Sequence, residues 1–185
     1  RRAINAALRV GGDKELQLLL DFARRTDLKE DIKAEALAAL GTWANPSYTD
    51  RVDGRYRGKI ERDPAAVKAK VLPYINEFLK EKNAEPLAAI VGLIADVKIT
   101  EANEQLVSIF DASESPRVKS AILTTLNQLG YAQIDAIVKK GMDDKEESVR
   151  TVALGLLNNN NVTKASLPLI VNSIFTKGTT REQQK

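Results

Sequence analysis

The chain has 185 residues and is 43% hydrophobic and 29% charged, which is the balance of a globular protein and not of a disordered one. It has no cysteine and no histidine, which excludes disulfides, thiolate or imidazole metal sites, cysteine nucleophiles and the Ser-His-Asp triad. The net charge of +3 does not by itself imply nucleic acid, and no apolar run is long enough to cross a bilayer.

The first part of the chain predicts three helices. Residues 3–10 have helical spacing, and Gly11-Gly12 predicts their end. Asp13 is the expected cap of a second helix, whose apolar residues are Leu16, Leu19, Leu20 and Ala23. Asp27 and Glu30 predict a capping box for a third helix. Its apolar residues are Ile32, Ala36, Leu37 and Leu40, and residues 41–43 close it.

A non-helical insertion is expected at residues 44–63. Asn45-Pro46 ends the helical pattern, and no helical period returns before Arg62. The segment is much longer than the two to eight residues that usually connect packed helices. Asp63-Pro64 then predicts a new helix, with Asp at the N-cap and Pro at the first helical position.

Helical spacing continues to the end of the chain, and no segment has the two-residue period of a strand. Apolar stripes occur in the segments 64–78, 86–94, 100–110, 116–129, 134–142 and 149–157. Thr100 and Ser115 are the expected caps of two of these helices. The run Asn158 to Asn161 predicts a tight turn, and a last helix carries Leu167, Ile170, Val171 and Ile174 and stops at Gly178.

One helix pattern recurs along the chain. Residues 118–126 (VKSAILTTL) and 149–157 (VRTVALGLL) align at an offset of 31 residues, and residues 32–40 match them again at the apolar positions. A fixed period of this length is typical of stacked helical repeats. We therefore predict an all-α superhelix of about four to five antiparallel helix pairs with one long inserted loop, a single array over residues 1–185.

The pattern V-[RK]-x-x-[AI]-L-x-x-L resembles the HEAT repeats, especially those with a short period. The resemblance covers nearly the whole chain and implies a solenoid fold. It does not imply a function, because such arrays bind proteins, nucleic acids and cofactors alike.

The insertion has two open interpretations. It contains five basic and four acidic residues and three of the nine aromatic residues, counted from Trp43 to Asp63. In the first, its charges pair with one another and with the repeat helices, and Trp43 anchors it to the core. In the second, it is a docking surface, because tyrosine and arginine dominate binding hot spots and long loops on rigid scaffolds often bind partners. The candidate partner-binding residues are Tyr48, Arg51, Arg55, Tyr56 and Arg57.

A narrower resemblance rests on the same segment. The motif W-A-N-P-x-x-x-D-R-V-D-G-R-Y-R, which starts at Trp43 and precedes R-D-P, is similar to the helical segment of the large haem-binding dehydrogenase-like proteins of Planctomycetes, Verrucomicrobia and Bacteroidetes. In that family a β-propeller precedes a HEAT array, and a cytochrome c domain with C-x-x-C-H follows it. This chain lacks both flanking domains, and it begins within a helical pattern, so we expect it to be a piece of a longer protein.

The resemblance implies a non-catalytic scaffold that links a propeller to a cytochrome c domain in a periplasmic or otherwise extracytoplasmic redox protein. The partners would be neighbouring domains of the same polypeptide or another protein. We expect no cofactor, no metal and no catalytic residue in this chain, and haem c in the parent protein, whose own enzymatic activity would resemble that of quinoprotein dehydrogenases.

Two other functions remain as alternatives. HEAT-like DNA glycosylases bind nucleic acid through a basic concave surface, and Trp43, Asp50 and the arginines would supply similar residue types. Against it, basic and acidic residues are interleaved throughout this chain, whereas DNA binding needs a coherent basic stripe. The second alternative is carboxylate catalysis or Ca²⁺ binding by Asp50, Asp53 and Asp63. Their spacing, however, lacks the alternating ligands of a calcium loop.

Overall fold

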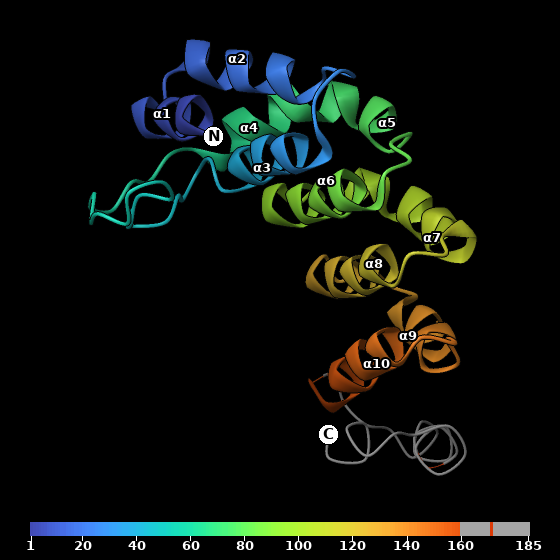
Figure 1. Cartoon of the computed structure of the whole chain (residues 1–185). Helices are drawn as coiled ribbons and strands as arrows, with labels where there is room; N and C mark the ends of the chain where they lie inside the picture. The colour runs from blue at the N-terminus through green and yellow to red at the C-terminus, as the bar shows by residue number, and fades with distance from the viewer. Residues whose placement is uncertain (160–170, 172–185) are drawn as a thin grey trace. The chain divides into compact units, whose positions relative to one another are not determined.

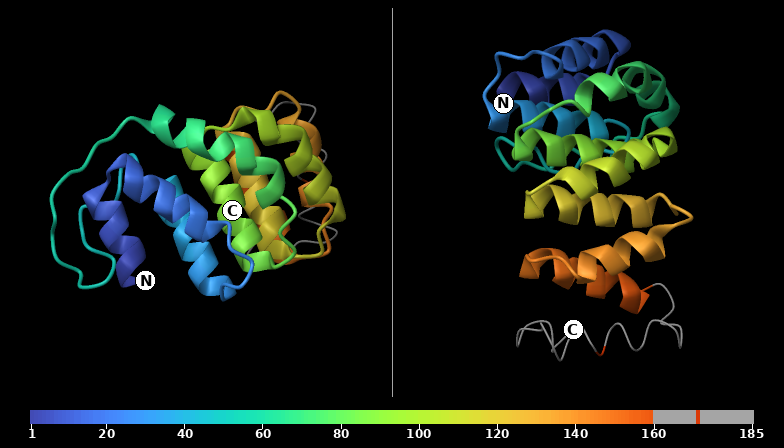
Figure 2. Two further views of the ribbon diagram at one scale, coloured as in Figure 1. Left: turned by 90° about the horizontal axis from the view of Figure 1, so that it is seen from above. Right: turned by 90° about the vertical axis from the view of Figure 1, so that its right-hand side faces the viewer.

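The computed structural model describes residues 1–159 and 171, and the regular structure in that part of the chain is helical. The all-α class is therefore confirmed. The chain divides into two compact units, Arg1–Ala102 and Asn103–Lys185 (Figures 1 and 2). Among the described residues, none of the helices is both long and apolar enough to span a membrane.

The first unit contains α1 (Arg2–Val10), α2 (Asp13–Ala23), α3 (Glu30–Gly41), α4 (Pro64–Val71), the short 3-10 helix η1 (Leu72–Tyr74), α5 (Ile75–Phe78), α6 (Ala84–Val97) and η2 (Thr100–Ala102). The described part of the second unit contains α7 (Asn103–Ala112), α8 (Pro116–Gln128), α9 (Ile134–Met142) and α10 (Glu147–Asn159).

The core of the first unit lies where α3 packs along α6, with α2 against α3 (Figure 1). Leu37 and Leu40 of α3 and Ile90 and Ile94 of α6 are fully buried. Burying each of these side chains contributes about 1.5–3 kcal/mol relative to exposure. The apolar stripes expected for these two helices are thus the surfaces that the unit buries.

In the second unit, α8 packs against α7, α9 and α10. Ile122 and Leu123 of α8 and Ala153 of α10 are buried in this core. At Gly141 of α9, an added Cβ would lie 2.9 Å from Cδ1 of Leu123 and 3.0 Å from Cβ of Ala153. The backbone of α9 therefore approaches its neighbours too closely to accommodate even a methyl group without a shift.

Several predicted helix ends are confirmed. Asp63 is the N-cap of α4, and its Oδ1 accepts a hydrogen bond of 2.9 Å from the amide of Ala65. The Oγ of Ser115 accepts a longer bond of 3.4 Å from the amide of Val118 at the start of α8. Gly11 ends α1 in the left-handed conformation, with φ of 70°.

Other predicted ends are wrong. The capping box at Asp27 and Glu30 does not form: Lys29 precedes α3 without a side-chain cap, and the carboxylate of Asp27 accepts two hydrogen bonds from Arg25 instead. Asp13 is the first residue of α2 and not its cap, which is Gly12. Thr100 begins η2, ahead of the helix it was expected to cap.

The helix expected over residues 64–78 is interrupted. It ends as α4 at Val71, passes through η1 and resumes as α5, because Pro73 has no amide hydrogen and its ring disfavours a continuous α-helix. At the other end of the chain, α10 continues through Asn159, so the turn predicted from Asn158 starts too early. The last predicted helix lies outside the described residues except for Val171.

Candidate docking loop

The connection between α3 and α4 is non-helical, as predicted for residues 44–63, and it extends alongside α1 (Figures 1 and 2). Its central part is a small hairpin of residues 48–57, which the sequence did not predict. The amide of Asp50 donates to the carbonyl of Arg55 at 2.8 Å, and the amide of Arg57 donates to the carbonyl of Tyr48 at 2.7 Å. At the tip, Gly54 has φ of 71°, a conformation that favours glycine.

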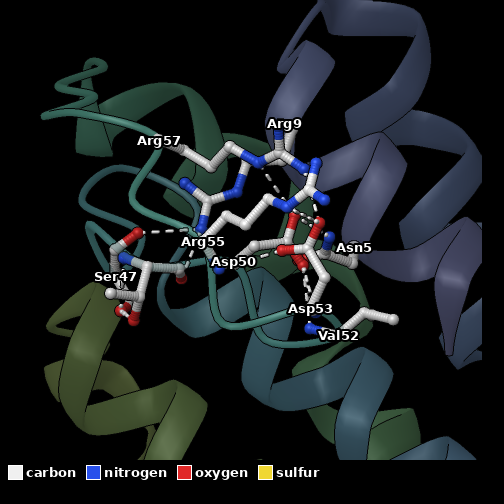
Figure 3. Close-up of polar contacts among 9 residues, drawn as sticks. Asn5, Arg9, Ser47, Asp50, Val52, Asp53, Arg55 and Arg57 are labelled. Atoms are coloured by element: carbon white, nitrogen blue, oxygen red, sulfur yellow. Dashed lines mark hydrogen bonds and ion pairs between the residues drawn. The ribbon is translucent and has the colours of Figure 1, made fainter.

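The hairpin is built around the carboxylate of Asp50, which is 8% exposed. Oδ1 accepts from the amides of Val52 at 2.8 Å and Asp53 at 3.2 Å (Figure 3). Oδ2 accepts from Nδ2 of Asn5 on α1 at 2.9 Å and lies 3.4 Å from Nε of Arg57. Because the Val52 amide and the Asn5 side chain stabilise the ionised form most, the pKa of Asp50 falls to about 2.

A second connection between α1 and the loop comes from Arg9. Its Nη2 donates to the carbonyls of Ser47 at 2.9 Å and Thr49 at 2.7 Å (Figure 3). These bonds join the end of α1 to the strand-like segment that precedes Asp50. Arg9 and Asn5 therefore attach the hairpin to α1 at two points, one through the backbone and one through a side chain.

Arg62 attaches the far end of the loop. Its Nη1 donates to the carbonyl of Trp43 at 2.6 Å, and its Nη2 donates to the carbonyl of Leu8 at 2.7 Å, near the end of α1. The guanidinium lies 5.0 Å from the centroid of the Trp43 ring, and Trp43 is 2% exposed. Burial, followed by the nearby charge of Arg9, lowers the pKa of Arg62.

The sequence did not single out Asn5, Arg9 or Arg62. Their partners lie about 20 to 55 positions away along the chain, and no local spacing marks such pairs. Nine of the twelve arginines lie between Arg1 and Arg62. This uneven distribution is a weak signal, because it does not show which of these arginines hold the loop.

The predicted partner-binding residues are all exposed, but they differ in how they are held. Tyr48 is 54% exposed and Tyr56 is 75% exposed. The side chain of Arg55 is 77% exposed, with only a 3.8 Å contact to Asp53. Arg57 differs, because its Nη2 donates to Asp53 Oδ2 at 2.8 Å and its Nε faces Asp50, so it also stabilises the hairpin.

The three loop aspartates considered for catalysis or calcium have other roles. Asp50 and Asp53 accept bonds from the hairpin amides and Arg57, whereas Asp63 caps α4. In the described part of the chain, no group of three or more acidic, cysteine or histidine residues is arranged to hold a metal ion.

Comparison with protein-family models, with curated proteins and with solved structures gave no match.

Proposed function

We propose that this chain is a HEAT-like helical-repeat scaffold whose loop, residues 44–63, docks a neighbouring protein domain. The observation that carries the proposal is a contrast within the hairpin. Asp50, Arg9 and Arg62 hold the loop in place through hydrogen bonds to α1 or from it, of which the bond between Asn5 and Asp50 is buried. Tyr48 and Tyr56, in contrast, expose more than half of their surface. A rigid loop that exposes aromatic rings is suited to protein recognition.

Contacts between successive repeat units support the repeat-scaffold part of the proposal. The three sequence copies fall on α3, α8 and α10, and each buries its central alanine or isoleucine and the leucine after it. In the second unit, Lys145 donates to Glu114 across 31 residues, and Lys140 donates to Asp111 across 29. Polar contacts at the repeat period are expected where equivalent turns of neighbouring repeats stack. Whether both units form one array stays a prediction.

The family resemblance suggests the partner. By that resemblance, the loop faces a propeller or cytochrome c domain of the same polypeptide, in an extracytoplasmic redox protein that carries haem c. This chain could not attach the haem itself, because it has no cysteine or histidine. Its role would be to position two domains relative to each other, without a catalytic residue of its own.

The docking role can be tested in the natural full-length protein. A photo-reactive phenylalanine analogue in place of Tyr56 should cross-link to one surface outside residues 1–185. The double variant Arg55→Ala/Tyr56→Ala should reduce the yield of a cross-link from position 48 several-fold. Lys59→Ala/Glu61→Ala is the matched control, since these residues of the same loop pair with each other. Cross-links confined to this chain's own helices would overturn the docking role.

The identity of the partner needs a separate measurement. The reduced-minus-oxidised visible spectrum of the full-length protein, expressed with cytochrome maturation enzymes, should show the α band of a c-type haem. A full-length protein without this band would remove the redox assignment and leave the docking role to be judged by the cross-links alone.

A further inference from the structure

A cleft of about 550 Å³ lies between α1 and the hairpin. One wall is a single face of α1 and carries Arg2, Asn5, Ala6 and Arg9. Residues three and four positions apart lie on the same side of a helix, so these four side chains share one face. The hairpin and the segment after it form the other wall, with Asp50, Val52, Asp53, Arg57 and Ile60. Val10 extends the wall of α1 at its C-terminal end.

The acidic residues of this cleft are already neutralised. Asp50 accepts from two amides and Asn5 and lies beside Arg57. Asp53 accepts from Arg57 and from the amide of Arg55. Arg57 serves both aspartates, and neither carboxylate forms an ion pair with Arg2 or Arg9 of α1.

The arginines of α1 have no carboxylate partner within the cleft. Nη2 of Arg9 bonds only to backbone carbonyls, and its Nε and Nη1 lie buried without an acceptor. Oδ1 of Asn5, a residue that is 7% exposed, also lacks a partner; as an acceptor it could bond a backbone N–H of a bound peptide but not a carboxylate. An unpaired buried donor costs free energy that an incoming acceptor would recover. The cleft thus combines uncompensated positive charge with unsatisfied hydrogen-bonding groups.

Another charged cleft of the described chain lacks this excess. Phe110 and residues around the start of α8 and the end of α9 line it, and each of its lysines is in an ion pair: Lys119 with Asp144, Lys140 with Asp111 and Lys145 with Glu114. An anion entering there would have to displace a carboxylate, whereas one entering beside α1 would not.

The cleft beside α1 also has an apolar part. Val10 is 70% exposed and Val52 is 44% exposed, and both line it together with Ala6 and Ile60. Exposed aliphatic side chains next to arginines match a peptide that alternates acidic and aliphatic residues better than they match a phosphate-rich surface.

We propose that this cleft binds an acidic peptide segment of the docking partner, with its carboxylates on Arg2 and Arg9 and an aliphatic side chain against Val10 and Val52. The inference rests on the proposed docking function and adds the chemistry that the partner must present. Charge-assisted bonds from arginine to carboxylate would supply the orientation, and the aliphatic contact would select among acidic sequences.

The test uses the whole chain and a fluorescent, capped peptide that alternates glutamate and leucine, with binding followed by anisotropy at about 0.1 M salt. Arg2→Gln should weaken binding by a factor of about ten, the usual order for loss of a charge-assisted contact. Arg2 has no role in holding the hairpin, so its variant keeps the loop intact. Arg51→Gln is the control, because Arg51 is an exposed arginine of the loop that does not line the cleft.

Two further peptides define the specificity. A lysine–leucine peptide should not bind, and a glutamate–serine peptide should bind at least several-fold more weakly. Equal binding of the glutamate–serine peptide, or equal binding to wild type and Arg2→Gln, would overturn the inference. If the cross-link from position 56 persists in that case, the docking function stands without this cleft. If the peptide binds as expected but no cross-link forms, the docking function fails instead.

Discussion

At the scale of single residues, the loop depends on a buried aspartate that no local pattern distinguishes from its neighbours. Asp50 accepts hydrogen bonds within the hairpin and from α1, so it links residues 45 positions apart. A neutral amide in its place would keep the shape but lose the charge that Asn5, the Val52 amide and Arg57 stabilise. Ordering a loop of this length costs considerable conformational entropy, and the hydrogen bonds of Asp50 help to offset that cost.

Asp50→Asn should loosen the hairpin without unfolding the helices. The asparagine side chain has one acceptor oxygen and one NH2 donor. In either orientation its NH2 group would face another donor, which is either the amides of Val52 and Asp53 or Nδ2 of Asn5. We expect faster trypsin cleavage after Arg51 and Arg55 and an unchanged far-ultraviolet circular dichroism spectrum. Glu61→Gln is the control, because Glu61 pairs only with the exposed Lys59. Unchanged cleavage in Asp50→Asn would show that Arg9 and Arg62 suffice to hold the loop.

The same carboxylate predicts a pH dependence. Its pKa is about 2 in the folded protein against an ordinary value of 3.8. A depressed pKa means that the ionised form stabilises the fold, so the contribution is fully present above about pH 4 and is lost as the pH falls through about 2. The amide resonance of Val52 should therefore titrate with a midpoint near 2 in an NMR pH series, and not in Asp50→Asn. A midpoint near 3.8 would contradict the buried, bonded state of Asp50.

At the scale of helices, small residues decide how closely the elements of the second unit approach. Gly141 faces the side chains of Leu123 and Ala153, whereas Gly92, inside α6, has nothing within 4 Å of the position of an added Cβ. Two opposing effects follow from glycine-to-alanine substitution. Helix propensity favours alanine by about 1 kcal/mol, and overpacking costs about 1–3 kcal/mol.

Gly141→Ala should therefore lower the free energy of unfolding by up to about 2 kcal/mol, since the Cβ of Ala153 cannot rotate away. Gly92→Ala should raise it by up to about 1 kcal/mol, because only the propensity term applies. Urea denaturation of the two variants measures both changes. Stabilisation by both substitutions would mean that α9 moves away from α8 at little cost.

At the scale of the whole molecule, the distribution of charge favours a protein partner over a nucleic acid. Ion pairs occur along the described chain, many of them between exposed side chains, and the net charge is only +3. In the described part of the chain, Arg2 and Arg9 of α1 and Arg51 of the loop beside it lack an ion pair with a carboxylate. Such a distribution suits a local contact with an acidic protein surface more than a long phosphate backbone.

The chain should therefore not bind duplex DNA in a gel-shift assay at about 50 mM salt, where electrostatic binding is strong. A DNA-binding protein of the glycosylase type would bind under these conditions, and its affinity would fall steeply as salt is added. Binding with that steep salt dependence would restore the nucleic-acid alternative and place the arginines of the loop against phosphates.

The sequence by itself determined the all-α class, the place of the insertion and, in the described part of the chain, most of the segments that form helices. These features follow from local spacing: apolar residues three and four apart, Pro and Gly at element ends, and a long stretch without a period. Asp63 and Ser115 were recognisable as caps because a capping side chain bonds within its own turn.

Only the tertiary structure decided how the insertion is held and which of its charges remain available. Asp50, Asp53 and Arg57 look equivalent to their neighbours in the sequence, yet they bond to one another, while Tyr56 is left exposed. Asn5, Arg9 and Arg62 act across long separations that sequence spacing does not encode. The failed capping box at Asp27 has a different, local cause, because Arg25, two positions away, takes its carboxylate. Hydrogen bonds between distant residues exist only after the chain has folded, so local pattern predicts the helices and not the loop's network of contacts.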